Sequence, residues 1–137
     1  MSFQIVEVLE SGSEKVKALV KHGSDQFSAI VAGKIMDELA VGKTFQAEIG
    51  YDDILAWKVV SDFEDNQSGI RQAEDGIHLL GRIHSVLDYG DGKTVVDVYL
   101  QNGPELFRVD VETIESDDLE PHSGLEIIVG NLYLSGR

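Results

Sequence analysis

Short runs of alternating apolar and polar residues dominate the chain. In TFQAEIGY (44–51), Phe45, Ala47, Ile49 and Tyr51 alternate with other residues, and FQIVEVLE, VKALVKHG and FSAIVAG follow similar patterns. The runs are short, and they end in turn signals such as SGSE, HGSD and VGK. A period of two with turn residues between the runs is typical of short antiparallel strands. The pattern therefore predicts an all-β meander.

Two segments have helical spacing instead. KIMDELA (34–40) can place Ile35 and Leu39 on one helical face, and IESDDLE (114–120) has a weaker form of the same pattern. We expect one short helical turn in each segment. Three meandering strands, a helical connection and one or two further strands resemble the order of small five-stranded barrels of the OB or SH3-like kind.

The two halves of the chain form a tandem internal repeat. They align at an offset of 78 residues, which two insertions of two residues each raise to 80 and then 82. Both insertions fall in turn regions, and an even insertion keeps the inward and outward faces of a strand in phase. The identical pairs are Ile5/Ile83, Val8/Val86, Leu9/Leu87, Gly12/Gly90, Lys15/Lys93, Val16/Val96, Gly23/Gly103, Phe27/Phe107, Val31/Val111, Asp37/Asp117, Leu39/Leu119, Gly42/Gly124 and Tyr51/Tyr133.

The repeat predicts three parts: a first β repeat at 1–60, an acidic polar linker at 61–77 and a second β repeat at 78–137. The second repeat ends soon after Tyr133, so its last strand is truncated, and a strand from the first copy can complete its sheet. Phe63 is expected to hold the linker locally, together with Ile70. The alternative arrangement is one fused β-sandwich or barrel of about ten strands.

The chain is strongly acidic. Twenty-five acids against eleven bases give a net charge of -14, and the second repeat is the more acidic one. Such a charge repels nucleic-acid phosphates and anionic membrane surfaces at long range. The sequence contains no cysteine, which excludes disulfides and thiolate chemistry, and it has no apolar run of membrane-spanning length. We expect a cytoplasmic protein that does not contact a membrane.

The tripeptide Gly-Lys-Thr occurs twice, at 42–44 and 92–94. In a nucleotide-phosphate loop, a further glycine stands five residues before the glycine of this tripeptide. Here that position is Asp37 in the first copy and Leu87 in the second. An alternating strand pattern also follows each tripeptide where a helix should begin. Both copies are therefore interpreted as turns that lead into strands.

Metal sites and cofactors are not expected. The segment DYGDG (88–92) lacks the alternate oxygen ligands of a calcium loop and fits an Asp-Gly hairpin turn. His22, His78, His84 and His122 are scattered, and none has the i, i+4 spacing of a zinc-binding helix. His78 and His84 would lie roughly 20 Å apart along one strand, too far to share a metal.

An acidic cluster in ETIESDDLEP supplies the candidate partner-binding residues. A catalytic carboxylate pair needs one desolvated carboxyl group, and a continuous charge run is normally solvated. No serine-nucleophile motif is present either. The sequence therefore predicts no enzyme but a binding module that engages a basic protein, as inhibitors, immunity proteins and nucleic-acid mimics do. The candidate residues are Glu112, Glu115, Asp117, Asp118 and Glu120.

The alternative is an OB-like protein that binds nucleic acid or a small ligand. Lys15, Lys17 and Lys21 have even spacing and can share one face of a hairpin. The net charge disfavours nucleic acid, and Trp57, with only Lys58 as a basic neighbour, is expected in the core or at a domain interface rather than on a stacking surface. An exposed edge strand can also pair with a second chain, so the oligomeric state is left open.

Overall fold

The computed structural model describes residues 2–33, 40–90, 93–99, 106–112, 119–120 and 122–135. The described chain is all-β, as predicted, and its only helical element is the short 3-10 turn η2 (Asp65–Gln67). The expected helical turns at 34–40 and 114–120 lie, except for their last residues, outside the described residues. The strands are β1 (Ser2–Ser11), β2 (Lys15–His22), β3 (Asp25–Ala32), β4 (Thr44–Gln46), β5 (Glu48–Tyr51), β6 (Ile54–Val60), β7 (Gly69–Ala73), β8 (Gly76–Gly90), β9 (Lys93–Tyr99), β10 (Leu106–Glu112), β11 (Gly124–Val129) and β12 (Leu132–Ser135).

The strands divide between two sheets. The first has the order β4-β1-β2-β3-β12-β5 and forms a curled half-barrel. The second has the order β10-β9-β8-β11-β6, and β7 pairs with β8 beside this path. The described strands therefore do not form the single barrel of the alternative arrangement, because they do not join into one sheet; the sandwich form of that alternative stays a prediction.

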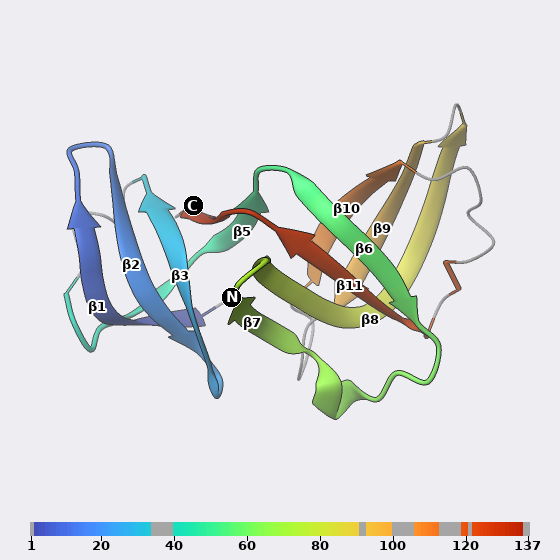
Figure 1. The fold of residues 1–137 in the computed structure, drawn as a ribbon, viewed down its shortest axis with the longest axis horizontal. Coiled ribbons are helices and arrows are strands. Elements are labelled where there is room, and N and C mark those ends of the chain that lie inside the picture. The colour runs from blue at the N-terminus through green and yellow to red at the C-terminus, as the bar shows by residue number, and fades with distance from the viewer. Residues whose placement is uncertain are drawn as a thin grey trace. The chain divides into compact units, whose positions relative to one another are not determined.

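The first sheet curls because of its connectivity. β4 and β5 lie at its two ends, yet only Ala47 separates them along the chain. The last residue of β4 and the first of β5 can therefore lie at most about 7 Å apart, so the sheet has to bend to bring its ends together. Figure 1 shows β1, β2 and β3 side by side in this bend. β12 pairs in parallel with β3, with Tyr133 opposite Ile30.

Each sheet contains a strand from the other half of the chain. β6 follows β5 in sequence but belongs to the second sheet, and β12 follows β11 but belongs to the first. The expectation that a strand of the first copy completes the second sheet is thereby confirmed. Tyr51 and Tyr133 are not equivalent, because they lie in the neighbouring strands β5 and β12.

By their contacts, residues of the chain group into two compact units. The first comprises Met1–Leu55, Ile70–His78 and Ile128–Arg137. The second comprises Ala56–Gly69 and Leu79–Ile127. The first sheet lies wholly in the first unit, since all six of its strands fall within those ranges.

The strand registers of the two sheets correspond. Ile5 pairs with Val20 in the first sheet, and Ile83 pairs with Val98 in the second, each residue 78 positions later. Both β1 and β8 also have a register shift directly after that isoleucine. A shared bulge is a backbone feature that no residue identity records.

The register corrects the position of the first insertion. Phe27 pairs with Val20, and Phe107, 80 positions later, pairs with Val98. The two extra residues therefore lie between β9 and β10, and not between β8 and β9 as expected. Val96 corresponds to Ala18 rather than to Val16, because Ala18 pairs with Val8 and Val96 pairs with Val86, each 78 positions later. The identity of Val16 and Val96 is therefore coincidental.

The turn before β4 shows a second correction. Gly42 N–H donates to Ile5 O at 2.8 Å, and His122 N–H donates to Ile83 O at 3.0 Å. Both donors have positive φ, 88° for Gly42 and 75° for His122. His122, and not Gly124, is thus the counterpart of Gly42. The first Gly-Lys-Thr forms this turn and leads into β4 as predicted, whereas Gly92 lies outside the described residues.

Aromatic residues fill the core of the first unit. Phe3 and Phe27 are fully buried, with ring centroids 6.2 Å apart and an edge-on angle of 87°. The ring centroid of Phe45 lies 5.9 Å from that of Phe3. In β3 the residues at 27, 29 and 31 are buried and alternate with half-buried positions, which is the predicted period of two. Such aromatic contacts add to the stability that area burial alone provides.

The segment at 61–77 is held by both residues expected to pin it. Phe63 is buried against Gly124, so close that a Cβ on Gly124 would lie 2.6 Å from Phe63 Cδ2. Ile70 in β7 is fully buried, and its N–H donates to Asp25 Oδ2 at 3.2 Å. These contacts stabilise η2 and β7 within their respective units.

Candidate functional site

The predicted acidic cluster is described only in part. Glu112 is the last residue of β10, and Glu120 is exposed after the buried Leu119. Glu115, Asp117 and Asp118 lie outside the described residues. The cluster therefore remains a prediction from the sequence.

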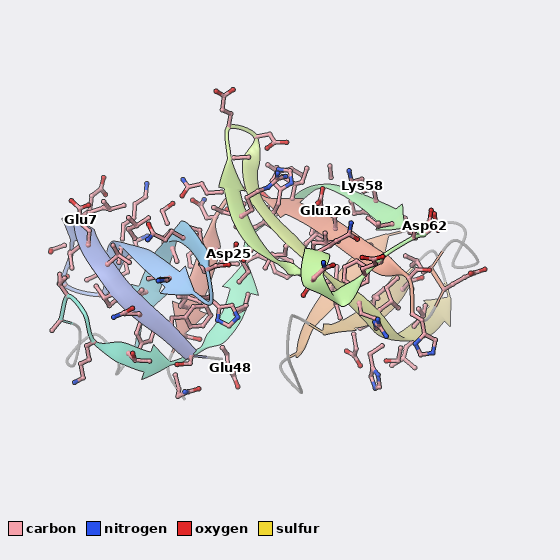
Figure 2. All side chains as sticks on the ribbon, turned by 90° about the horizontal axis from the view of Figure 1, so that it is seen from below. Glu7, Asp25, Glu48, Lys58, Asp62 and Glu126 are labelled. Carbon is pink, nitrogen blue, oxygen red and sulfur yellow. The ribbon has the colours of Figure 1, made fainter. Side chains whose placement is uncertain are left out.

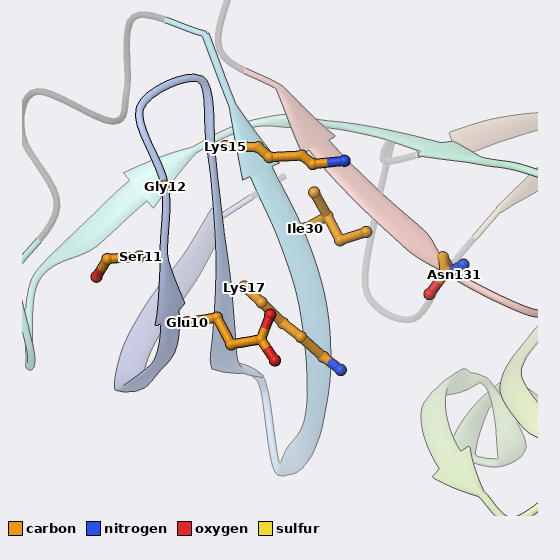
Figure 3. A pocket seen from close by; sticks show the side chains of 7 residues that line it. All are labelled: Glu10, Ser11, Gly12, Lys15, Lys17, Ile30 and Asn131. Carbon is orange, nitrogen blue, oxygen red and sulfur yellow. The ribbon is translucent and has the colours of Figure 1, made fainter.

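A cleft of about 370 Å³ opens on the first unit (Figure 3). The β1–β2 hairpin provides most of its lining, β3 provides an apolar residue, and the residue before β12 completes it. The lining residues are Glu10, Ser11, Gly12, Lys15, Lys17, Ile30 and Asn131. A volume of this size lies at the lower end of the range for small-molecule sites.

The alternation of β2 brings the lysines to one face. Ala18 and Val20 are buried, whereas Lys15, Lys17 and Lys21 are exposed. The shared face predicted for the three lysines is thereby confirmed, although Lys21 is not among the residues that line the cleft.

An isoleucine lies between the two lysines of the cleft. Ile30 is half-buried on β3 directly opposite Lys17 in the β2–β3 register. Figure 3 shows its side chain between those of Lys15 and Lys17, with Asn131 beyond it. The cleft therefore has an apolar floor with two ammonium groups at its sides.

A glycine closes the hairpin end of the cleft. A Cβ on Gly12 would lie 2.7 Å from Lys15 O, closer than real Cβ contacts come. Position 12 has to be glycine for the β1–β2 turn to keep this approach. The turn in this way fixes the start of β2 and the position of Lys15.

A carboxylate holds the opposite wall. Asn131 N–H donates to Asp52 Oδ1 at 3.0 Å, and Asn131 Nδ2 donates to Asp52 Oδ2 at 2.8 Å. These two hydrogen bonds from Asn131 lower the pKa of Asp52 below its ordinary value. Because the amide nitrogen is committed to Asp52, the Asn131 side-chain oxygen is the atom that can accept from a ligand.

The cleft combines groups that can bind a polar ligand. Lys15 and Lys17 can donate, Glu10 and the Asn131 oxygen can accept, and Ile30 offers an apolar surface. Among the described residues that line the cleft there is no aromatic side chain of the kind on which bases stack at many nucleic-acid binding surfaces.

A second polar group occupies the β7–β8 hairpin. His78 is buried, its Nε2 lies 2.7 Å from Asp75 Oδ1, and its Nδ1 lies 3.3 Å from Arg71 Nη2. Arg71 can only donate, so Nδ1 accepts and Nε2 carries the proton that bonds Asp75. The hydrogen bond from His78 is the main cause of the lowered pKa of Asp75. This group joins the two strands of the hairpin.

The remaining histidines are separate from one another. His22 Nδ1 lies 2.9 Å from Ser2 O, and its ring lies 5.2 Å from that of Phe3. His84 and His122 are exposed. Within the described residues, no group of three or more His, Asp or Glu side chains is arranged to hold a metal ion. None of the described residues form a helix with the length and hydropathy needed to cross a membrane.

The sequence indicated the lysine face but not the whole cleft. Asn131 is far from the hairpin in sequence and reaches the cleft only because β12 pairs with β3. Nothing local to Asn131 marks that position.

No protein-family model matches the chain, and no curated protein sequence matches it either.

Proposed function

We propose that the protein is a non-catalytic binding module whose acidic surface engages a basic protein partner. The net charge of -14 is the observation that carries this proposal. Acids are exposed in both units, among them Glu7 and Glu14 in the first and Asp62, Glu64 and Glu120 in the second. Electrostatic attraction of this kind accelerates encounter with a basic partner and disfavours acidic ones.

The finer fold supports binding over catalysis. The first sheet runs β4-β1-β2-β3-β12-β5, in which β3 and β12 are parallel and the other neighbouring strands are antiparallel. We propose that both units are OB-like barrels that arose from a tandem repeat and exchanged their last strands, β6 and β12. Barrels of this kind present outer strands and loops to ligands.

A capture experiment with the source-cell lysate tests the acidic surface. The immobilised protein is incubated with nuclease-treated lysate at low and at high salt, and retained proteins are identified. We expect a basic protein that is retained at low salt and released at high salt. The bait E115Q/D117N/D118N should retain it less, whereas the control bait E7Q/E14Q, which carries nearly the same net charge, should retain it almost normally. Equal retention by the first variant would contradict the role of the cluster.

A second candidate function is supported by the place of the cleft. OB folds bind oligonucleotides and oligosaccharides over their second and third strands, between the loop after the first strand and the loop before the fifth. Gly12 lies in the β1–β2 turn, Lys17 and Ile30 lie on β2 and β3, and Asn131 precedes β12. The cleft of the first unit has the same location.

Titration with a labelled single-stranded oligonucleotide distinguishes the two candidates. If the cleft binds such strands, fluorescence anisotropy at low salt should rise, and K15A/K17A should abolish the rise. The control K43A removes an exposed lysine outside the cleft and should leave the signal unchanged. A flat titration for the unmodified protein would exclude single strands and leave small ligands as the class to screen by thermal shift.

A further inference from the structure

The two sheets differ where an OB-like barrel would close. In the first, β12 pairs with β5 on one side and with β3 on the other. In the second, β6 takes the place of β12 and pairs with β11, but no described strand pairs with its other edge. β10, the counterpart of β3, is likewise the terminal strand of the second sheet.

The free edge of β6 is long and incompletely covered. None of its seven residues is buried, although six are apolar, and Trp57, Val59 and Val60 are only half-buried. In β12, by contrast, Leu132 and Leu134 are almost fully buried. The end strands of the first sheet, β4 and β5, have only three and four residues.

β6 has few of the features that normally protect an edge strand. Proteins guard such edges with proline, bulges, short strands or projecting lysines. β6 contains no proline and a single lysine, Lys58. Its ammonium group lies 3.6 Å from Glu126 Oε1 on the neighbouring β11. Figure 2 labels both residues.

Two exposed acidic residues come directly after β6 in the sequence. Asp62 and Glu64 are exposed directly after β6, and Figure 2 shows Asp62 near the end of the strand. Phe63, between them, is packed against Gly124, which fixes the two acids next to the start of β11. A chain that runs along β6 would therefore meet backbone donors and acceptors, apolar side chains and two carboxylates.

We propose that the free edge of β6 receives an extended basic segment of the partner as an added strand. This inference rests on the proposed function and names the element that binds. Backbone hydrogen bonds to β6 would supply affinity, as in other cases of strand addition. Alternate apolar side chains would cover Trp57 and Val59, and lysines or arginines at the end would pair with Asp62 and Glu64.

Trp57 makes a direct test simple, because it is the only tryptophan of the chain. The probe is a synthetic peptide of roughly ten residues in which lysine and valine alternate, which favours an extended strand. Trp57 fluorescence reports contact with β6, and calorimetry reports binding anywhere on the protein. The matched peptide carries an N-methyl group on every residue, so it keeps the charge but has no backbone N–H to donate to β6.

We expect the unmodified peptide to change Trp57 fluorescence in a saturable and salt-sensitive way. The N-methylated peptide should bind at least about tenfold more weakly because the backbone bonds are lost. The variant D62N/E64Q should weaken binding roughly fivefold, and E7Q/E14Q, which removes two acids from the first unit, less than about twofold.

Three other results would overturn the proposal in distinguishable ways. Salt-sensitive binding that leaves Trp57 unchanged and tolerates N-methylation would reject the β6 edge but keep an acidic binding surface. No binding of the basic peptide by calorimetry, even at low salt, would reject the proposed function itself. Fluorescence that depends on protein concentration without peptide, together with a dimer in sedimentation, would assign the edge to a second copy of the chain.

Discussion

The two units fill equivalent core positions with different side chains. The first unit buries Phe3 where the second has the buried Gly81, 78 positions later. Other buried positions change in the opposite sense, because small residues of the first unit are replaced by larger ones in the second. These buried pairs are Ala18/Val96, Ala29/Val109 and Ala47/Ile127.

The strand pairing supports this correspondence. Ala18 lies opposite Ala29 on β2 and β3, and Val96 lies opposite Val109 on β9 and β10. Two paired alanines of the first core thus correspond to two paired valines of the second, while a buried phenylalanine corresponds to a buried glycine. When one core residue becomes smaller and others become larger, the total side-chain volume is kept and the core stays filled. Proteins tolerate such combined changes better than a change of size at one position. The comparison teaches that the repeat preserves backbone and total volume rather than individual residues.

Removal of the aromatic side chain should have the largest effect. Phe3→Ala deletes a fully buried ring that contacts Phe27 and Phe45, so we expect a loss of about 3–5 kcal/mol in the free energy of unfolding. Urea denaturation followed by circular dichroism measures it.

A double-variant cycle then tests the compensation. Ala18→Val alone should cost about 1–3 kcal/mol by overpacking, and less in the Phe3→Ala background where space exists. Additive effects of the two changes would contradict the proposed exchange of volume between the units.

The next effect concerns the contact of Gly124 with Phe63 in the second unit. Gly124→Ala would bring a methyl group to within 2.6 Å of the buried ring, and we expect a loss of about 1–3 kcal/mol by overpacking. Thr44 is the counterpart of Gly124 in the first unit and is exposed. Thr44→Ala is therefore the matched control, with an expected change within about 0.5 kcal/mol. Equal urea midpoints for the two variants would show that Phe63 does not restrict position 124.

A smaller effect of opposite sign is expected at the turn before β11. His122 has a φ of 75° where its counterpart Gly42 has 88°. A non-glycine residue with left-handed backbone is strained by roughly 1–2 kcal/mol, although glycine also loses more entropy on folding. His122→Gly should therefore raise the unfolding free energy by about 1 kcal/mol, and Gly42→Ala should lower it by a similar amount. Destabilisation by His122→Gly would show that its side chain makes a contact worth more than the strain.

The smallest effect concerns the carboxylate beside β12 in the first unit. Hydrogen bonds from Asn131 lower the pKa of Asp52 below 3.8, so these bonds stabilise the fold above the unfolded-state pKa. That contribution is lost as the pH falls through the lower, folded-state pKa. Since Asp52 is exposed, we expect only a few tenths of a kcal/mol. An NMR titration should show the lowered pKa of Asp52 in the unmodified protein and a partial rise in Asn131→Ala, which removes the side-chain bond but keeps the stronger backbone bond. An unchanged pKa would argue against the side-chain bond.

Much of the first unit could be predicted from local sequence. Alternation in FSAIVAG indicated the buried residues of β3, and the even spacing of Lys15 and Lys17 indicated their common face. Turn residues marked the end of most strands, as at Gly23, whose positive φ at the first position of a two-residue turn matches a favoured hairpin geometry. These features depend on neighbours in the chain, so the chain alone carries them.

The alignment of the repeat was less accurate than its existence. The identity of Val16 and Val96 placed the first two-residue insertion between β8 and β9, whereas the register places it between β9 and β10. Gly124 was likewise preferred to His122 as the counterpart of Gly42. An alignment by residue identity pairs Gly42 with another glycine. The backbone shows instead that His122 has the positive φ and the hydrogen bond of Gly42. The correct correspondence required the hydrogen-bond register.

By itself, the sequence determined the all-β class, the period of two, the lysine face and the acidic character, because these follow from residue type and local spacing. Only the tertiary structure decided that β6, from the first half of the chain, joins the second sheet and that β12, from the second half, joins the first. It also decided that Asn131 completes the cleft and that no strand of the described residues pairs with the outer edge of β6. Strand partners are chosen by contacts across many residues of chain, and several pairings satisfy the same alternation. Local pattern therefore specifies the strands, and packing selects which strands meet.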